Sequence, residues 1–144
     1  MLVSQILKSK KDDGVVTVPP STTIAEAAEM LSTRRIGAVV VSSDGKRLQG
    51  IFSERDLVRE LGRRGSSCLP DTLQTVMTSS VTTCRRDDQA DAVLVKMTAG
   101  RFRHIPVVEG DEMVGLISIG DVVKARLDEL AMENDALAGM IKGF

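Results

Sequence analysis

Two serine–aspartate pairs in this sequence have the types and spacing of a site for phosphate and ribose. Ser53 precedes Asp56 by three residues, and Ser118 precedes Asp121 by the same interval. A serine at the point where a strand gives way to a helix caps free backbone N–H groups, which together with the helix dipole attract an anion. A carboxylate only accepts hydrogen bonds, so each aspartate suits the hydroxyls of a ribose. The pairs therefore predict a nucleotide pocket.

The same spacing also has a purely structural interpretation, because Ser-x-x-Asp is a variant of the capping box that begins many helices. Gly50–Asp56 and Gly115–Asp121 share one pattern, however, with a glycine and two apolar residues before the serine, and they lie 65 residues apart. Two copies of a motif inside a longer repeat favour nucleotide binding over capping alone.

The elements around the two motifs repeat in the same order. Val15–Val18 and Val81–Cys84 predict short strands, and Thr23 with Glu26 predicts a capping box at the start of an amphipathic helix. In the first half we expect that helix to end near Arg34 and Arg35, followed by strands Gly37–Val41 and Leu48–Phe52 and helix Glu54–Leu61. In the second half we expect a helix around Ala90–Met97, strands Ile105–Val108 and Met113–Ile117, and a terminal helix from Asp121 to about Asn134.

The repeat predicts an α+β fold of two β-α-β-β-α units packed sheet to sheet with pseudo-twofold symmetry. Units of this size are marginal alone, so the two should share a core. The predicted boundaries are an N-terminal arm (1–13), a first repeat (14–66), a linker (67–76), a second repeat (77–131), and a helix end with a tail (132–144).

The composition of the 144 residues excludes several functional classes. Net charge is −1, and the chain has no Trp, no Tyr and three Phe, which argues against nucleic acid as a partner. No apolar run could span a membrane, and the N-terminus lacks the features of an export signal, so we expect a cytoplasmic protein. One histidine with the isolated Cys68 and Cys84 offers neither a metal site nor a catalytic constellation, and we expect no enzyme.

These motifs, with the strand Ile105–Val108, resemble the tandem CBS-domain pair, or Bateman module, over about residues 14–130. The first half departs from the family pattern by having Val40 where the second half has Pro106. Stand-alone pairs of this size also resemble the regulatory insert of IMP dehydrogenase, whose catalytic barrel has no counterpart here. The resemblance implies a regulatory, energy-sensing module that binds AMP, ADP or ATP, with NAD(H) or S-adenosylmethionine, which some members bind, as alternatives.

The resemblance also implies roles for individual residues. Asp56 and Asp121 would hold ribose hydroxyls, and Ser53 and Ser118 would help to hold phosphate. The adenine would lie against the backbone around Val15, Val16, Val81 and Thr82, with opposite walls at Ile36, Gly37, Ala38, Phe102, Arg103 and His104.

The halves differ in their charged residues, so the two clefts should not be equivalent. Arg55 in the first motif corresponds to Gly120 in the second, and Arg103 and His104 stand where the first half is apolar. Guanidinium groups suit phosphate, and we include Arg35, Arg55, Arg103 and Gly120 among the candidate site residues. The alternatives are that Arg34, Arg35, Arg101 and Arg103 are solvated charges at helix C-termini and that His104 is a packed, hydrogen-bonded histidine.

The resemblance further implies a homodimer, because Bateman modules commonly form disc-like dimers, and an unknown target protein. Apolar residues at Leu127, Leu130, Ala131 and Leu137 support association. They could instead fold back on their own chain. The main alternative function is a ligand-free module for protein interaction or structure.

Overall fold

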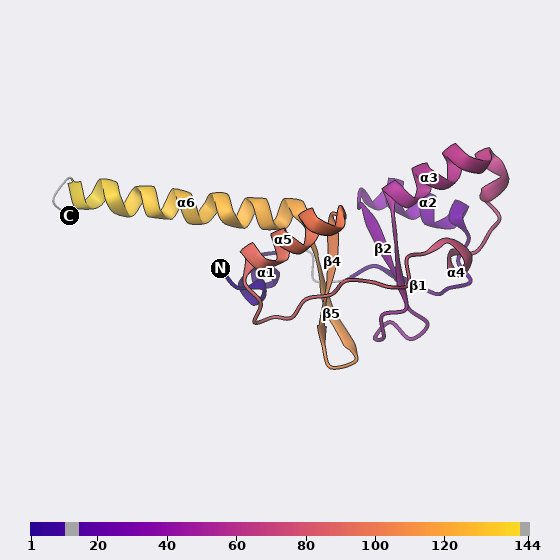
Figure 1. Cartoon of the computed structure of the whole chain (residues 1–144), viewed down its shortest axis with the longest axis horizontal. Helices are drawn as coiled ribbons and strands as arrows, with labels where there is room; N and C mark the ends of the chain where they lie inside the picture. The colour runs from indigo at the N-terminus through magenta and orange to yellow at the C-terminus, as the bar shows by residue number, and fades with distance from the viewer. Residues whose placement is uncertain (11–14, 142–144) are drawn as a thin grey trace.

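The computed structural model describes residues 1–10 and 15–141, and each half of the chain forms a small sheet covered by helices. The two sheets lie beside one another in the middle of the molecule, with most helices on the outside (Figure 1). This arrangement confirms the predicted α+β fold. The first half contains β1 (Thr17–Val18), α2 (Ile24–Arg34), β2 (Ala38–Val41), β3 (Gly50–Ser53) and α3 (Glu54–Arg64). The second contains α5 (Ala90–Gly100), β4 (His104–Glu109), β5 (Glu112–Ser118) and α6 (Ile119–Ile141).

The first half follows its predicted order closely. Thr23 and Glu26 form the expected capping box, with the Glu26 N–H donating to Thr23 Oγ1 over 3.1 Å. Apolar residues of α2 then pack on β2 and β3, burying Ile24, Leu31 and Phe52 almost completely. The helix ends at Arg35, whose left-handed conformation (φ 52°) stops the helical hydrogen bonding.

The predicted strand Val81–Cys84 is reduced to a single parallel bridge between Cys84 and Val107. In the first half, the N–H of Val40 donates to the carbonyl of Val16 over 3.0 Å, next to the β1–β2 pairing. The equivalent donor in the second half is Pro106, which has no N–H. One ladder bond is therefore impossible there, and the regular strand is lost.

The N-terminal segment forms helix α1 (Val3–Ser9), and this helix packs in the core of the second half. Its Val3 and Ile6 are fully buried beside Val93 and Ile117. Residues 11–13 of the predicted arm lie outside the described residues. The domain boundary at residues 13 and 14 stays a prediction.

The predicted linker packs on the first half. It holds the end of the 3-10 turn η1 (Gly65–Cys68) and the short helix α4 (Leu73–Val76). Cys68 and Leu73 are both fully buried in the first-half core. Helix α4 therefore joins the first half as α1 joins the second, so each core includes a helix from beyond the predicted repeat.

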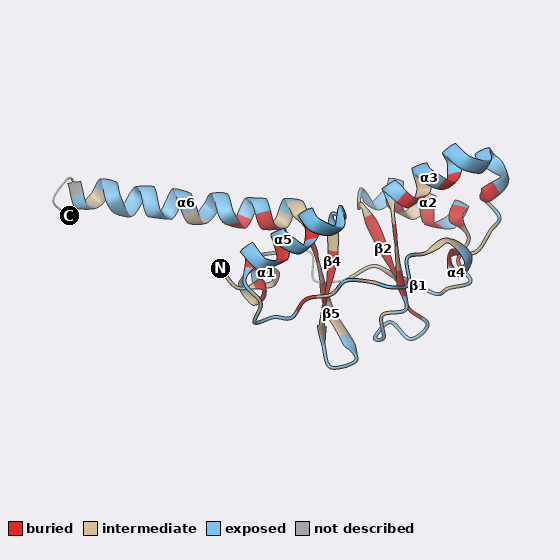
Figure 2. Ribbon diagram, in the orientation of Figure 1, coloured by how far each residue is buried: buried red, intermediate tan, exposed pale blue. Residues whose placement is uncertain are grey.

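Helix α6 is longer than predicted and projects from the body (Figure 1). Its first turns are held in the second-half core through Val122 and Ala125. Beyond them the helix is largely exposed (Figure 2). In the described part of the chain, no helix combines the length and apolar character that a membrane crossing requires.

Candidate functional site

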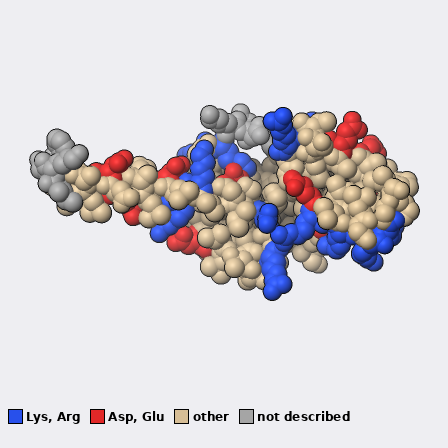
Figure 3. Space-filling view, turned by 90° about the horizontal axis from the view of Figure 1, so that it is seen from above, with Lys and Arg blue, Asp and Glu red and all other residues tan. Residues whose placement is uncertain are grey.

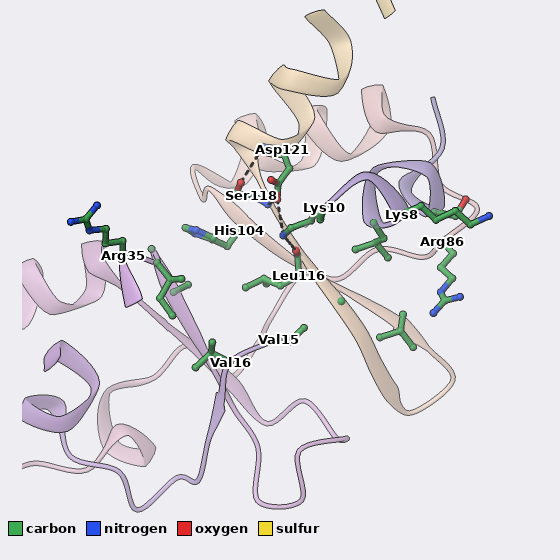
Figure 4. Close-up of a pocket in the computed structure, with 17 residues that line it drawn as sticks. Lys8, Lys10, Val15, Val16, Arg35, Arg86, His104, Leu116, Ser118 and Asp121 are labelled. Atoms are coloured by element: carbon green, nitrogen blue, oxygen red, sulfur yellow. Dashed lines mark hydrogen bonds and ion pairs between the residues drawn. The ribbon is translucent and has the colours of Figure 1, made fainter. Parts of the chain in front are cut away.

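A cavity of about 640 Å³ lies between the two halves, and both contribute to its wall. The residues after α2 approach the end of β5 across this cavity (Figure 4). The structure thus gathers predicted residues of the adenine wall and of the second motif. The predicted residues that line it are Val15, Val16, Arg35, Ile36, Gly37, Ala38, His104, Ser118 and Asp121.

Asp121 is held at the mouth of helix α6 by the second motif itself. Its Oδ2 accepts the N–H of Ser118 over 2.9 Å, and its own N–H donates to Ser118 Oγ over 3.1 Å. The capping interpretation of the motif is therefore correct in geometry. It does not exclude ligand binding, because Oδ1 accepts no hydrogen bond from any described residue.

Lys10 contacts the same carboxylate from the end of α1. Its Nζ lies 2.9 Å from Asp121 Oδ2 and donates to the carbonyl of Leu116 over 2.7 Å (Figure 4). Burial alone would raise the pKa of Asp121. The hydrogen bonds from Ser118 and Lys10 outweigh burial and hold that pKa below its ordinary value. Asp121 is therefore ionised at neutral pH.

His104 begins β4 and lies against the backbone of Gly37 from the other half. Burial lowers the pKa of its imidazole, although the Glu54 and Asp121 carboxylates oppose that effect. The nearby Lys10 and Arg103 lower the pKa further. The ring is therefore a neutral imidazole at pH 7, able to donate one hydrogen bond and accept another.

The first motif is arranged differently, because both oxygens of its carboxylate already accept hydrogen bonds. Asp56 Oδ2 accepts hydrogen bonds from the N–H and the hydroxyl of Ser53, over 2.9 and 3.1 Å. Its Oδ1 accepts a bond from Arg59 over 2.8 Å, and the residue is only 7% exposed. The expectation of two non-equivalent environments agrees with this difference.

The remaining predicted site residues do not line the cavity beside Asp121. Arg55 instead crosses to the other half, where its Nη1 donates to the carbonyl of Arg101 over 3.0 Å. Arg103 is exposed, and Phe102 packs against the second-half core. The predicted residues outside the cavity are Ser53, Arg55, Asp56, Val81, Thr82, Phe102, Arg103 and Gly120.

Sequence reasoning missed the contribution of the N-terminal helix. Ser4, Leu7, Lys8 and Lys10 all line the cavity, and Arg86 joins them from the segment before α5. One signal in the sequence could have pointed to them. The apolar residues Val3, Ile6 and Leu7 recur 70 residues later as Leu73, Val76 and Met77, which marks a repeated unit outside the predicted repeats.

Basic side chains gather near the boundary between the halves on the face seen in Figure 3. Among the lining residues that the structure describes, Lys8, Lys10, Arg35 and Arg86 are cationic, and Asp121 is the one carboxylate. Arg86 is also paired with Glu109 over 3.2 Å. No group of His, Cys, Asp and Glu side chains among the described residues has the arrangement of a metal site.

Comparison with known proteins gives this architecture a family context. The family model of the CBS domain matches residues 3–63 and 73–128. A protein of Acidianus ambivalens, described as an uncharacterized 17.7 kDa protein in the bps2 3' region, is 32% identical over 142 residues, covering 98% of this chain and 82% of the relative. At 30% identity over 131 residues, 89% of this chain matches 24% of the longer Arabidopsis thaliana protein CBSCBSPB1.

Solved structures share the fold over most of their length. A CBS-domain-containing protein from Agrobacterium tumefaciens is 44% identical, with a TM-score of 0.83 over 88% of this chain and 99% of that chain. A CBS domain protein from Pyrobaculum aerophilum, complexed with AMP, is 30% identical, with a TM-score of 0.76 over 92% of this chain and 99% of that chain. The CBS domain pair of protein MJ0100, in complex with 5-methylthioadenosine and S-adenosyl-L-methionine, is 25% identical, with a TM-score of 0.78 over 90% of this chain and 98% of that chain.

Proposed function

This chain belongs to the CBS domain family as a tandem pair, and on that basis we propose that it is a regulatory module that senses an adenosine nucleotide in the cavity beside Asp121. The structures of related pairs with AMP, and with 5-methylthioadenosine and S-adenosyl-L-methionine, support an adenosine-type ligand. The module transmits binding to a target protein, and it carries no catalytic activity of its own.

One observation carries this proposal. The cavity joins the wall predicted to hold adenine, at Val16 and Ile36–Ala38, to the Ser118 and Asp121 pair predicted to hold ribose and phosphate. These groups come from different halves of the chain. Its volume of about 640 Å³ lies within the range of roughly 300–1,000 Å³ that is typical of small-molecule sites.

The two motifs are not expected to bind equally. Asp121 keeps Oδ1 without a described donor, whereas both oxygens of Asp56 already accept hydrogen bonds. A ribose at Asp56 would have to share Oδ1 with Arg59, at a carboxylate that is only 7% exposed. We therefore assign the stronger site to Asp121.

Isothermal titration with AMP, ADP, ATP, NAD(H) and S-adenosylmethionine tests this assignment. We expect an adenosine compound to bind wild type, with affinity reduced about tenfold or more in Asp121→Asn and by less than about threefold in Asp56→Asn, because among the described residues Asp121 Oδ1 has no donor, whereas both oxygens of Asp56 already accept hydrogen bonds. Equal losses in the two variants would contradict the choice of cleft. No binding by wild type would reject the sensor and favour the ligand-free interaction module.

We also propose that two copies associate. The exposed side chains of Leu127, Leu130 and Leu137 on α6 are 60%, 41% and 56% accessible, so the stripe does not fold back on its own chain. Light scattering at micromolar concentration should give a dimer mass for wild type and a smaller mass for Leu137→Lys. Val95→Lys, at another exposed apolar position of 66% accessibility, is the control and should stay dimeric. A monomeric wild type would contradict this proposal.

A further inference from the structure

The ion pair between Lys10 and Asp121 links two distant parts of the chain inside the cavity. Lys10 Nζ lies 2.9 Å from Asp121 Oδ2, and the two side chains are 28% and 25% exposed. Lys10 also donates to the carbonyl of Leu116, so two acceptors of the second half hold the ammonium group. The pair is partly buried, where charges are less screened than at a free surface.

The backbone position of Lys10 is fixed because the helix before it, α1, packs in the second-half core. Val3 and Ile6 of α1 are fully buried in the second-half core. Leu7 lies so close to Gly115 that an ideal Cβ there would be 2.6 Å from Leu7 Cδ2. Three residues after this contact, Lys10 reaches the cavity, so the packing of α1 sets the position of its side chain.

The first half has no equivalent cation. Met77 occupies the place of Leu7, since an ideal Cβ at Gly50 would lie 2.5 Å from Met77 Sδ. The residue three positions later is Ser80, where the second-half arrangement has Lys10. The carboxylate of Asp56 is paired within its own helix by Arg59. The lysine is therefore specific to the cavity beside Asp121.

Lys10 changes the charge that a ligand meets. It neutralises Asp121, the one carboxylate among the described lining residues, and Lys8 and Arg35 add further positive charge, whereas the charge of Arg86 is offset by Glu109. Lys8 and Arg86 lie apart from the Lys10–Asp121 pair, on the other side of Lys10 from His104 (Figure 4). A cationic ligand is disfavoured in this field, and an anionic one is favoured.

We infer that Lys10 is the residue that sets the charge selectivity of the cavity, favouring adenosine ligands that carry phosphate over neutral or cationic ones. Ribose hydroxyls donate to Asp121 Oδ1, which leaves Lys10 to donate to a phosphate oxygen. S-adenosylmethionine, with its sulfonium and a net positive charge, lacks the group that Lys10 binds. This inference rests on the proposed function and adds a ligand class to it.

The test compares AMP, adenosine and S-adenosylmethionine by titration calorimetry on wild type, Lys10→Met, Lys10→Arg and Lys8→Met. Loss of one charge-assisted hydrogen bond should weaken AMP about tenfold in Lys10→Met. Adenosine should change less than about twofold, because it has no phosphate, and S-adenosylmethionine should bind no more weakly than before. Lys10→Arg should keep most of the preference for AMP over adenosine.

Lys8→Met is the matched control, because it removes a cation from the same cavity without touching Asp121. It should weaken AMP by less than about threefold. An equal loss of AMP affinity in Lys8→Met and Lys10→Met would overturn the inference. It would show that the total positive charge of the cavity, and not Lys10 in particular, favours phosphate. Equal losses of AMP and adenosine in Lys10→Met would overturn it in favour of a structural role. If wild type binds none of these three compounds and none of ADP, ATP and NAD(H), the proposed function itself fails, and the inference fails with it.

Discussion

Gly37 and His104 meet across the boundary between the two halves. An ideal Cβ on Gly37 would lie 2.8 Å from both Cε1 and Nε2 of the His104 ring. A real Cβ almost never comes so close, so the ring can occupy this place only beside a glycine. The structure therefore explains the glycine after Ile36 by the histidine that begins β4, and both residues line the cavity.

Gly37→Ala should displace the His104 ring and destabilise the protein by about 1–3 kcal/mol, the usual cost of overpacking. Gly62→Ala is the matched control, because Gly62 lies in α3 with nothing within 4 Å of an added Cβ. That change should be neutral or stabilising by up to about 1 kcal/mol, since alanine favours a helix more than glycine. Urea unfolding of both variants measures the difference.

A second variant separates the contact from other effects of the new methyl group. Gly37→Ala combined with His104→Ala should lose less stability than the sum of the single changes, because the clash is gone in the double variant. Additive losses would contradict the explanation.

The depressed pKa of His104 predicts how stability depends on pH. Burial favours the neutral ring, so the folded-state pKa lies below the ordinary value of 6.5. The unfolded chain then takes up a proton first as the pH falls, and stability is complete above about pH 6.5 and decreases below it. His104→Gln should make the free energy of unfolding depend less on pH between about 5 and 6.5. Parallel pH profiles for wild type and variant would count against this assignment.

The same neutral state makes a prediction for binding. We expect His104 to contribute no pH dependence to AMP affinity between pH 7 and 8, because its proton is already lost in the folded protein. Titrations of AMP across this range should therefore give parallel pH profiles for wild type and His104→Gln. A dependence that disappears in the variant would show that the ring titrates near neutral pH.

Much of the fold could be predicted because the determining interactions are local. The capping box of Thr23 and Glu26 and the apolar face beginning at Ile24 fix α2 within one stretch of sequence. The prediction of a strand at Val81–Cys84 was wrong in extent, because the hydrogen bonding of a strand also depends on the strand beside it, here β4. Pro106, on that partner, removes a hydrogen-bond donor.

The candidate site was only partly predictable for a related reason. Ser118 and Asp121 lie in one short motif, so their capping geometry follows from their spacing. Lys10 contacts Leu116, which lies 106 positions away in the sequence, and no local pattern predicts that contact. The packing of α1 in the second-half core was not predicted, because residues 1–13 were interpreted only as an N-terminal arm.

The glycines that open the two motifs should respond differently to the same substitution. An added Cβ at Gly50 would lie 2.9 Å from the carbonyl oxygen of Thr78, whose backbone is tied to Ile51 by hydrogen bonds of 3.0 Å in both directions. At Gly115 the nearest atoms belong to the side chain of Leu7, which can rotate. Gly50→Ala should therefore lower the free energy of unfolding more than Gly115→Ala. Equal losses, or the reverse order, would contradict this account of the two contacts.

Cys84 should be chemically inert in the folded protein. Its side chain is 2% exposed, and burial, with a smaller contribution from the Asp88 carboxylate, raises the pKa of the thiol to about 11. The reactive thiolate is then about one part in a thousand at pH 8.

In a Cys68→Ala background, an aromatic disulfide reagent should label Cys84 only as fast as the protein unfolds, and at once in urea. Adding Thr82→Cys places a thiol at an exposed position two residues away, which should react immediately in the folded state. Reaction of Cys84 as fast as that control would show that the thiol is accessible in solution. The β-bridge between Cys84 and Val107, which packs in the second-half core, would then have to open far more often than this structure implies.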